Sequence, residues 1–471
     1  MNANVIVLSL VLATTATAEE WRQFRGPNAA GVAKTAAPVT PAPEENLIWK
    51  TAVPPGHSSP IFTSDRIYFT AIEDEKLFTY SLDLESGKVL WTREAPRPRS
   101  GRTHRVNNAA AATPVTDGEN VYVFFGDFGL LAYNRDGDEL WKLPLGPFNN
   151  GMGMSSSPIL ADGKLVLVCD ADSGSYMMAL DPSNGEIVWK TDRQEYTRSF
   201  STPTVYRPAD GPAELIVPGS FQVAGYSLES GKKLWWSGGF CWQPKTSASV
   251  IGDTVFVHCW TGGGDSPVST REQYPSFEEV LAQYDADKNG KITQEEAFLE
   301  KMRKNIKPFD IDKNGAVEER DWNYFLNKNK TTNSVMAIRL GGRGDVTLTH
   351  VKWVERKSLP NVPSPVVYDG VVYLVKDGGV MSALDAESGK VLKRGRLSNA
   401  MGRYFASPVA SNGHLYFLDE EGSLTVVKAG PQWEVVHSYA FGEGGNSTPA
   451  VVDGRLYIRT HENLYCFGEV Q

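Results

Sequence analysis

Two short segments of the sequence place oxygen-bearing side chains at alternate positions. The first, DADKNGKITQEE at residues 285–296, has a glycine at its sixth position, which permits the sharp turn that wraps such a segment around one ion. Carboxylate, amide and carbonyl oxygens are the ligands that Ca²⁺ takes in proteins. The segment therefore predicts a calcium site with these ligands: Asp285, Asp287, Asn289, the carbonyl oxygen of Lys291, Thr293 and Glu296.

The second segment, DIDKNGAVEERD at residues 310–321, repeats the pattern of the first. It predicts a second calcium site with these ligands: Asp310, Asp312, Asn314, the carbonyl oxygen of Ala316, Glu318 and Asp321. Two acidic surface turns are the structural alternative, but two matches in tandem favour a pair of EF-hand loops. Because Asp321 is one methylene shorter than Glu296, we expect the second site to bind Ca²⁺ more weakly or to tolerate Mg²⁺ better.

The two calcium loops lie among apolar residues at helical spacing, which predict short helices around one small core. The residues expected in this core are Phe277, Val280, Leu281, Tyr284, Phe298, Met302, Ile306, Trp322, Phe325 and Leu326. Ile292 and Val317 occupy the eighth position of each loop, where two coupled loops would pair as a short strand. We therefore expect residues 265–331 to form a separate helical module.

The chain on either side of this module repeats one phrase, a Ser-Pro or Thr-Pro followed by two alternating apolar strands around a tight turn. Its prolines are Pro60, Pro114, Pro158, Pro203, Pro365, Pro408 and Pro449, and a copy at Ala248 lacks the proline. The interval of about 45 residues is the size of a propeller blade of four strands. The one longer interval, between Ala248 and Pro365, contains both calcium loops.

A second phrase follows the first in each repeat, as in ALDPSNGEIVW at residues 179–189. Its glycine closes a turn with positive φ, and its tryptophan ends the outer strand. We expect Trp91, Trp141, Trp189 and Trp235 to pack against neighbouring blades rather than to hold a cofactor. The last repeat is one strand short, and NLIWKT at residues 46–51 is a strand without a partner. That strand is expected to complete the last blade, which closes the ring.

The A-x-D-x-x-[TS]-G-x-x-x-W phrase resembles the tryptophan-docking repeat of the quinoprotein, or PQQ-like, propellers. WRQFRGPNAAGV at residues 21–32 is similar to the opening of secreted bacterial PQQ-like repeat proteins. The resemblance covers nearly all of the chain outside the helical module. It implies an all-β fold, an eight-bladed β-propeller of quinoprotein type closed by the N-terminal strand, with a small α-helical EF-hand pair inserted in blade five. The superfamily includes alcohol dehydrogenases and assembly scaffolds such as BamB, so the resemblance implies fold rather than chemistry.

The N-terminal residues contain an apolar run from Val5 to Leu12 followed by Ala16-Thr17-Ala18, which is typical of an export signal. The run is too short to span a bilayer, so we expect a periplasmic or extracellular monomer without a transmembrane anchor. A formal charge of −9 argues against a nucleic-acid partner. The expected divisions are a signal peptide at 1–18, a linker at 19–45, the propeller at 46–264, the EF-hand pair at 265–331 and the rest of the propeller at 332–471.

The linkers that enter each innermost strand are expected on the same face of the propeller as the helical module. Seven of their residues would surround the channel mouth: His104, Arg105, Arg198, Trp242, Lys245, Arg403 and Asn446. Cationic groups converging on an acidic protein predict a small anionic or carbohydrate-like ligand, or a protein partner. Solvated loop residues are the alternative, and Arg198 could instead bridge two blades.

The quinoprotein dehydrogenases that the chain resembles hold a quinone with calcium, a catalytic aspartate and a disulfide between adjacent cysteines. None of the four cysteines here is adjacent to another, and Cys241 and Cys259 could either bridge or remain free thiols. PQQ is therefore not expected. The favoured interpretation is an exported calcium-binding propeller that binds a ligand or partner without chemistry. The alternatives are a PQQ-dependent alcohol or sugar dehydrogenase and a BamB-like assembly scaffold.

Overall fold

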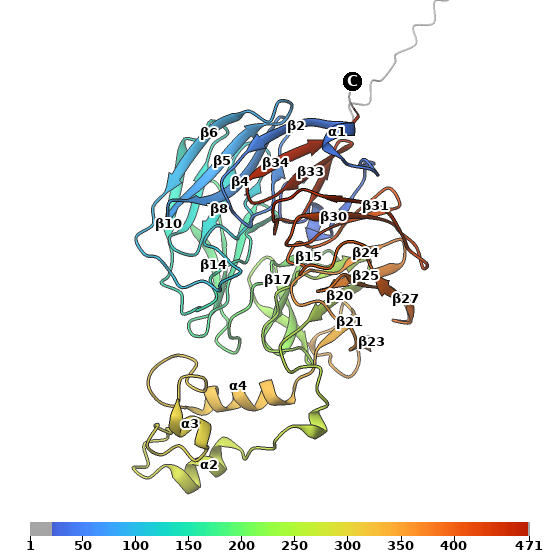
Figure 1. The fold of residues 1–471 in the computed structure, drawn as a ribbon. Coiled ribbons are helices and arrows are strands. Elements are labelled where there is room, and N and C mark those ends of the chain that lie inside the picture. Colours follow the sequence, from blue (N-terminus) through green and yellow to red (C-terminus); the bar gives the residue numbers. More distant parts are fainter. Residues whose placement is uncertain (1–20, 470–471) are drawn as a thin grey trace, which may run out of the picture.

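The computed structural model describes residues 21–469, so the predicted signal peptide at 1–18 lies outside the described residues. Eight antiparallel sheets of four repeat strands follow one another along the chain (Figure 1). The innermost strands of successive sheets contact one another, which arranges the sheets as the blades of a propeller. The predicted eight-bladed β-propeller is confirmed. None of the helices within residues 21–469 is long and apolar enough to cross a membrane.

The first four blades run from the innermost strand outward in chain order. Blade one contains β3 (Ile61–Phe62), β4 (Arg66–Glu73), β5 (Lys76–Asp83) and β6 (Val89–Ala95). Blade two contains β7 (Val115–Thr116), β8 (Val121–Phe125), β9 (Gly129–Tyr133) and β10 (Glu139–Pro144). Blade three contains β11 (Ile159–Ala161), β12 (Lys164–Cys169), β13 (Tyr176–Leu180) and β14 (Ile187–Asp192). Blade four contains β15 (Thr204–Tyr206), β16 (Glu214–Gly219), β17 (Gln222–Ser227) and β18 (Lys233–Ser237), with β22 (Gly344–Asp345) added at its outer edge.

The second four blades continue this order. Blade five contains β19 (Ser249–Ile251), β20 (Thr254–Cys259), β21 (Ser334–Arg339) and β23 (Val351–Glu355). Blade six contains β24 (Val366–Tyr368), β25 (Val371–Lys376), β26 (Val380–Asp385) and β27 (Val391–Arg396). Blade seven contains β28 (Val409–Ser411), β29 (His414–Leu418), β30 (Ser423–Lys428) and β31 (Glu434–Ala440), and β1 (Val32–Ala33) pairs with β28. Blade eight contains β32 (Ala450–Val452), β33 (Arg455–Arg459), β34 (Asn463–Phe467) and β2 (Leu47–Ala52).

Blade eight is built from both ends of the chain. Strand β2 lies antiparallel to β34, with Trp49 opposite Cys466 and Thr51 opposite Leu464. A short helix, α1 (Pro43–Asn46), and a 3₁₀ turn, η1 (Pro27–Ala29), precede β2. The N-terminal strand thus closes the ring as predicted, and it covers the outer edge of β34 that would otherwise remain unpaired.

The repeated tryptophan and glycine meet across blade boundaries. Trp141 of blade two donates its indole N–H to the carbonyl of Pro182 in blade three at 2.8 Å. Its ring lies so close to Gly185 that a Cβ there would be 2.7 Å from the indole, and Gly185 has a φ of 75°. Only glycine satisfies both requirements without strain. The same contact recurs for Trp49, Trp91, Trp189 and Trp353. Trp235 instead bonds Glu214 of its own blade at 2.8 Å.

The Ser/Thr-Pro phrase forms a ring of hydrogen bonds around the channel. The hydroxyl before each proline accepts the backbone N–H of the equivalent residue in the preceding blade, as Thr113 Oγ1 does from Ser59 N at 2.9 Å. Seven such bonds join the residues Ser59, Thr113, Ser157 and Thr202, and then Ser247, Ser364, Ser407, Thr448 and again Ser59. These bonds satisfy buried backbone N–H groups that a strand ladder does not reach.

The helical module lies between the second and third strands of blade five. Strands β20 and β21 pair directly, with Cys259 opposite Ser334, so residues 260–333 leave and re-enter the sheet at one point. This insertion contains η2 (Val268–Thr270), α2 (Phe277–Tyr284), α3 (Glu300–Lys304) and α4 (Glu319–Lys330). Its buried core consists of Phe277, Val280, Ile292, Ala297, Met302, Ile306, Phe309, Val317 and Trp322. Helix α4 lies between the ring and the rest of the insertion (Figure 1).

Candidate functional site

A cavity of about 480 Å³ opens on the propeller face that carries the insertion. The linkers that lead into the innermost strands form its wall, and Ser59, Ser157, Thr202, Ser247 and Thr448 of the hydrogen-bonded ring lie at its base. Helix α4 of the insertion contributes Lys328. Among the predicted ligand residues, His104, Trp242, Lys245 and Asn446 line this cavity.

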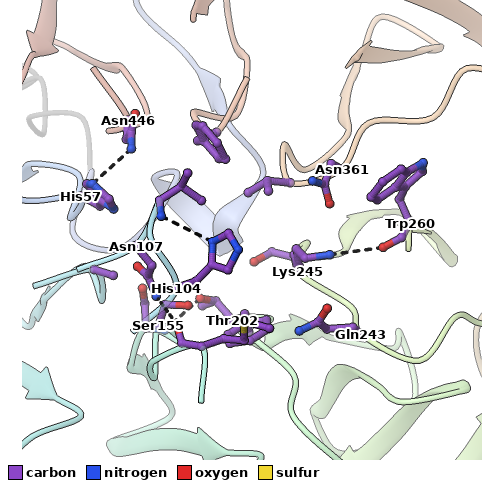
Figure 2. A pocket seen from close by; sticks show the side chains of 18 of the residues that line it. His57, His104, Asn107, Ser155, Thr202, Gln243, Lys245, Trp260, Asn361 and Asn446 are labelled. Carbon is purple, nitrogen blue, oxygen red and sulfur yellow. Dashed lines mark hydrogen bonds between the residues drawn. The ribbon is translucent and has the colours of Figure 1, made fainter. Parts of the chain in front are cut away.

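The cavity wall includes aromatic and basic side chains. The aromatic residues are Phe24, Phe200, Trp242, Trp260 and Phe405, and the basic residues are His57, His104, Lys245 and Lys328. Figure 2 shows Lys245 and His104 reaching into the cavity from different linkers. None of the described residues that line it is an aspartate or glutamate. The cavity therefore presents positive charge beside apolar faces.

Lys245 has no acidic partner among the described residues. Its Nζ donates to the carbonyl of Trp260 at 3.3 Å and lies 5.9 Å from the centre of the Trp260 ring (Figure 2). Burial lowers the pKa of Lys245 because desolvation penalises the charged form. Lys328 is also without a carboxylate, and its Nζ lies 4.3 Å from the centre of the Trp242 ring. An anion between these ammonium groups would compensate both charges.

The opposite wall of the cavity is neutral. Asn446 Nδ2 donates to Nε2 of His57 at 3.1 Å (Figure 2). Burial, followed by the charges of His461 and Arg459, lowers the pKa of His57 to about 4. The imidazole is therefore uncharged near pH 7, so it can accept this bond. Asn446 Oδ1 is buried and without a hydrogen-bond partner, which leaves one acceptor facing the cavity.

The remaining predicted ligand residues lie elsewhere. Arg198 donates Nε to Oδ1 of Asp172 at 2.6 Å, and the Asp172 side chain is only 2% exposed. Arg403 makes a similar pair with Glu420, but its side chain is 43% exposed. Arg105 and Arg198 line a second hollow of about 570 Å³ beside the insertion. Arg198 and Arg403 thus have partners of their own.

Several cavity residues were not foreseen from the sequence. Lys328 and Trp260 flank the insertion boundaries, and Asn361 belongs to the linker before blade six. The helical spacing of α4 identified the residues that pack inside the insertion, but it could not show which face of α4 meets the ring. In the sequence, a basic residue two positions after Leu326, Lys328, was an indication that this face of α4 meets the propeller.

The first calcium loop brings carboxylate oxygens of Asp285, Asp287 and Glu296 within 4.8 Å of one another. Gly290 N donates to Oδ2 of Asp285 at 2.9 Å, and Thr293 Oγ1 donates to Oε2 of Glu296 at 2.9 Å. Backbone and hydroxyl donors thus orient the carboxylates toward one point. This arrangement provides the hard oxygen ligands that suit Ca²⁺.

The second loop gathers Asp310, Asp312 and Asp321 in the same way. Burial, followed by the charges of Asp312 and Asp310, raises the pKa of Asp321 to about 6, although two backbone N–H groups oppose this shift. Glu318 is not part of this group, and its Oε1 accepts Lys291 Nζ at 2.6 Å and Asn314 Nδ2 at 3.0 Å. The two loops are joined by reciprocal backbone bonds between Ile292 and Val317 at 2.9 and 2.8 Å.

Helix α4 connects the second loop to the cavity. Tyr324 packs edge-on against Phe221 and Trp242, with ring centres 5.4 and 5.9 Å apart. Arg320, in the first turn of α4, donates to the carbonyl of Asp172 at 2.8 Å. One face of this helix therefore belongs to the insertion and the other to the propeller.

Cys241 and Cys259 lie next to the cavity, each directly before one of its tryptophans. Both are buried free thiols, as are Cys169 and Cys466. The backbone N–H of Cys241 donates to Sγ of Cys259 at 2.8 Å, so the two linkers that carry Trp242 and Trp260 are in direct contact.

A family described as outer membrane protein assembly factor BamB matches the chain over residues 42–156, 151–238 and 343–471. These ranges cover more than half of the chain and omit the insertion. The quinoprotein alcohol dehydrogenase PedH of Pseudomonas putida is 26% identical over 190 residues, which span 37% of this chain and 29% of that protein. The match thus covers less than a third of the length of this curated relative.

Solved structures share the fold at low identity. A europium-containing methanol dehydrogenase has a TM-score of 0.62 and 10% identity, covering 97% of this chain and 99% of its own. BamB from Moraxella catarrhalis has a TM-score of 0.55 and 9% identity, covering 90% of this chain and 97% of its own. At such identities these likenesses show the fold alone, since one fold hosts many functions.

Proposed function

Since the chain belongs to the family described as outer membrane protein assembly factor BamB, we propose that it is a propeller-based binding protein of the cell envelope. It takes a small anionic or carbohydrate-like ligand into the central cavity and holds Ca²⁺ in the two loops of the insertion. It performs no chemistry on the ligand. The N-terminal sequence pattern and the envelope role in the family's description support export.

One observation carries this proposal, the absence of any carboxylate from the described lining of a cavity that holds two lysines without acidic partners. Ammonium groups in an apolar wall are unfavourable until an anion compensates them. The cavity volume lies within the ordinary range for small-molecule sites.

The relationship to quinoprotein dehydrogenases raises the question of whether PQQ fits this cavity. In those enzymes the quinone would supply redox chemistry beside a metal ion. A metal in the cavity would require carboxylate or comparable oxygen ligands, and the described lining offers three asparagines and one glutamine but no acid. The acidic clusters of the described residues are both in the insertion. The donor set therefore does not fit a metal-bound quinone.

Calcium has a structural role in this proposal. Six carboxylates converge in two clusters, and each cluster repels itself until a cation neutralises it. Ions in both loops would hold the loop that precedes α4 in one conformation, which keeps α4 against the ring. Affinities of order 10⁻⁴ to 10⁻³ M are ordinary for calcium sites of extracellular modules.

The full-length protein should be titrated calorimetrically with Ca²⁺, then mixed with PQQ and assayed for dye-linked alcohol oxidation. We expect two calcium-binding events and no PQQ-dependent dye reduction. Dye reduction that needs both PQQ and the protein would show that the dehydrogenase alternative is correct.

An assembly scaffold is the second candidate, favoured by the family description. A protein partner would then contact the face that carries the cavity and the insertion. Deleting the gene in its own organism would reduce the amounts of folded outer membrane proteins if this candidate is correct. Unchanged amounts would favour the ligand-binding function.

A further inference from the structure

We propose that the ligand is an acidic sugar, a hexuronate or a chain that ends in one, held in the central cavity beneath helix α4. This inference rests on the proposed binding function and names its ligand class. Three features of the cavity wall carry it: two cations, two buried groups without hydrogen-bond partners among the described residues, and aromatic faces.

The two lysines of the cavity wall explain why the proposed ligand carries a carboxylate. Lys245 comes from the linker into blade five, and Lys328 comes from the insertion, so the charges reach the cavity from independent elements. Neither faces a carboxylate, whereas Arg198 and Arg403 beside the cavity are already paired. A carboxylate would accept charge-assisted hydrogen bonds from both ammonium groups, which are about twice as strong as neutral ones.

A gap in the ring of hydrogen bonds explains why the proposed ligand carries hydroxyl groups. Seven bonds join the residues before the repeat prolines, but no bond is found from Thr202 to Ser247 among the described residues. Ser247 is 1% exposed, and its hydroxyl has no partner although it lines the cavity. Asn361 Oδ1 is likewise buried, unpartnered and at the wall.

These groups distinguish a sugar acid from a simple organic anion. An amide oxygen can only accept a hydrogen bond, so Asn361 requires an O–H or N–H donor from the ligand. A carboxylate has no proton to donate at neutral pH and would leave this acceptor unsatisfied, which costs about 1–3 kcal/mol for a buried group. A polyhydroxylated anion satisfies the lysines and Asn361 together.

The aromatic residues explain why the proposed ligand contains a pyranose ring. Trp260 and Phe405 line the same cavity as Asn361, and the C–H faces of a pyranose are apolar enough to pack on them. Trp242 is held by its bond to Thr261 Oγ1 and by Tyr324 of α4. The insertion is therefore part of the binding site, because it supplies Lys328 and fixes Trp242.

Binding can be measured by calorimetry on the calcium-loaded, full-length protein. The probes are D-glucuronate, D-galacturonate and D-mannuronate, the neutral hexose that matches each, and benzoate as an apolar anion without hydroxyls. We expect at least one uronate to bind with Kd below about 1 mM, and at least about tenfold more tightly than its hexose and than benzoate. Binding should weaken as salt is raised.

Each lysine is tested by Lys245→Met and Lys328→Met, which remove the charge but keep the length of the side chain. Each variant should lose about tenfold or more in uronate affinity. Lys330→Met is the matched control, because Lys330 ends the same helix and does not line the cavity. Its affinity should stay within about twofold of the parent.

The hydroxyl is tested by Ser247→Ala against Ser364→Ala. Ser364 Oγ accepts the backbone N–H of Ser247 at 3.0 Å, so Ser364→Ala should lower the thermal midpoint. Ser247→Ala should weaken uronate binding severalfold without lowering the midpoint, because its hydroxyl has no partner to lose.

Three results would overturn the inference: no uronate binding below about 1 mM, equal binding of uronate and hexose, or tighter binding of benzoate. Lysine variants that keep full affinity would also overturn it. Each of these results leaves the proposed function standing, because that function is tested separately by calcium binding, by PQQ-dependent turnover and by the gene deletion.

Discussion

The propeller and the helical insertion are stabilised in different ways. The propeller consists of eight sheets. Indole–glycine contacts and a ring of hydroxyl–amide hydrogen bonds join neighbouring sheets. The insertion has a core of nine buried side chains, and beside it lie six carboxylates in two clusters. The contacts that hold the propeller together all lie within the propeller itself. Under the proposed function, the insertion would in addition depend on cations that neutralise its loops.

The two regions nevertheless share one wall. Arg320 of α4 contacts the β12–β13 loop of blade three, Tyr324 contacts the linker into blade five, and Lys328 reaches the cavity. Loss of the insertion would therefore leave the pairing of blade five intact but would remove part of the cavity wall. The following predictions test this separation.

The largest effect is expected from removing the insertion. Replacing residues 265–331 with a short Gly-Asn turn should leave a folded propeller that binds no calcium, because β20 and β21 pair directly where the insertion begins and ends. Circular dichroism and a single retained thermal transition would show the fold, and calorimetry the loss of calcium. A variant that fails to fold would mean that the insertion is an integral part of blade five.

Chelation should have the next largest effect, and only on the insertion. Without cations the clusters at Asp285 and Asp310 repel themselves, so the insertion should open while the ring stays folded. Limited proteolysis with EGTA should cut first within residues 265–331, and added Ca²⁺ should restore resistance. Equal cleavage with and without EGTA would contradict a structural role of calcium.

Acid should act on the ring rather than on the insertion. Burial lowers the pKa of His258, whose side chain is 0% exposed, to about 4, from 6.5. The unfolded chain then takes up a proton between pH 6.5 and 4 that the folded chain does not, so stability is full above pH 6.5 and falls as the pH drops.

The loss from His258 should be roughly 3 kcal/mol across this range. Urea unfolding of calcium-loaded protein at several pH values measures it. His258→Gln should reduce the slope, while His57, whose pKa burial also lowers to about 4, keeps part of it. An unchanged slope in this variant would show that other groups cause the loss.

The two arginine pairs at the cavity rim should differ. Arg198→Ala leaves the carboxylate of Asp172, 2% exposed, without its partner, and should cost about 3 kcal/mol. Arg403→Ala should cost less than about 1 kcal/mol, because its pair is exposed. Chemical denaturation compares them. Equal costs would mean that burial does not separate the two pairs.

The smallest effect should separate the two calcium loops. Glu296→Gln should weaken its site more than Asp321→Asn weakens the other, because the longer carboxylate reaches both ligand positions on the ion. The expected difference is about tenfold in affinity by calorimetry. Equal losses would contradict the ranking of the sites.

Much of the fold could be predicted because the sequence patterns that specify it involve residues close together in the chain. The phrase around each Ser/Thr-Pro specifies a hairpin, and Gly185 with Trp141 shows why the second phrase recurs once per blade. The orphan strand at Trp49 and the missing last strand together predicted the closure that β2 provides. These patterns depend on neighbours in sequence or on the identical neighbouring repeat.

The cavity was less predictable because its contacts join distant segments. Lys245 and Arg198 look alike in the sequence, and only the position of Asp172, 26 residues before Arg198, separates a paired cation from an unpaired one. Lys328 belongs to another module altogether. Likewise, the unpartnered hydroxyl of Ser247 is visible only once the other seven bonds of the ring are known.

The pairing of β2 with β34 also sets the timing of folding. During synthesis β2 is made long before β34. Strand β2 therefore cannot pair with its neighbour until nearly all of the propeller has been made. Loop-closure entropy rises only slowly with length, so this long wait adds little to the free energy of closure. It does mean that every shorter chain exposes an unpaired edge, which invites aggregation and proteolysis. The pairing of β2 with β34 thus makes closure of the ring depend on two strands that lie far apart in the sequence.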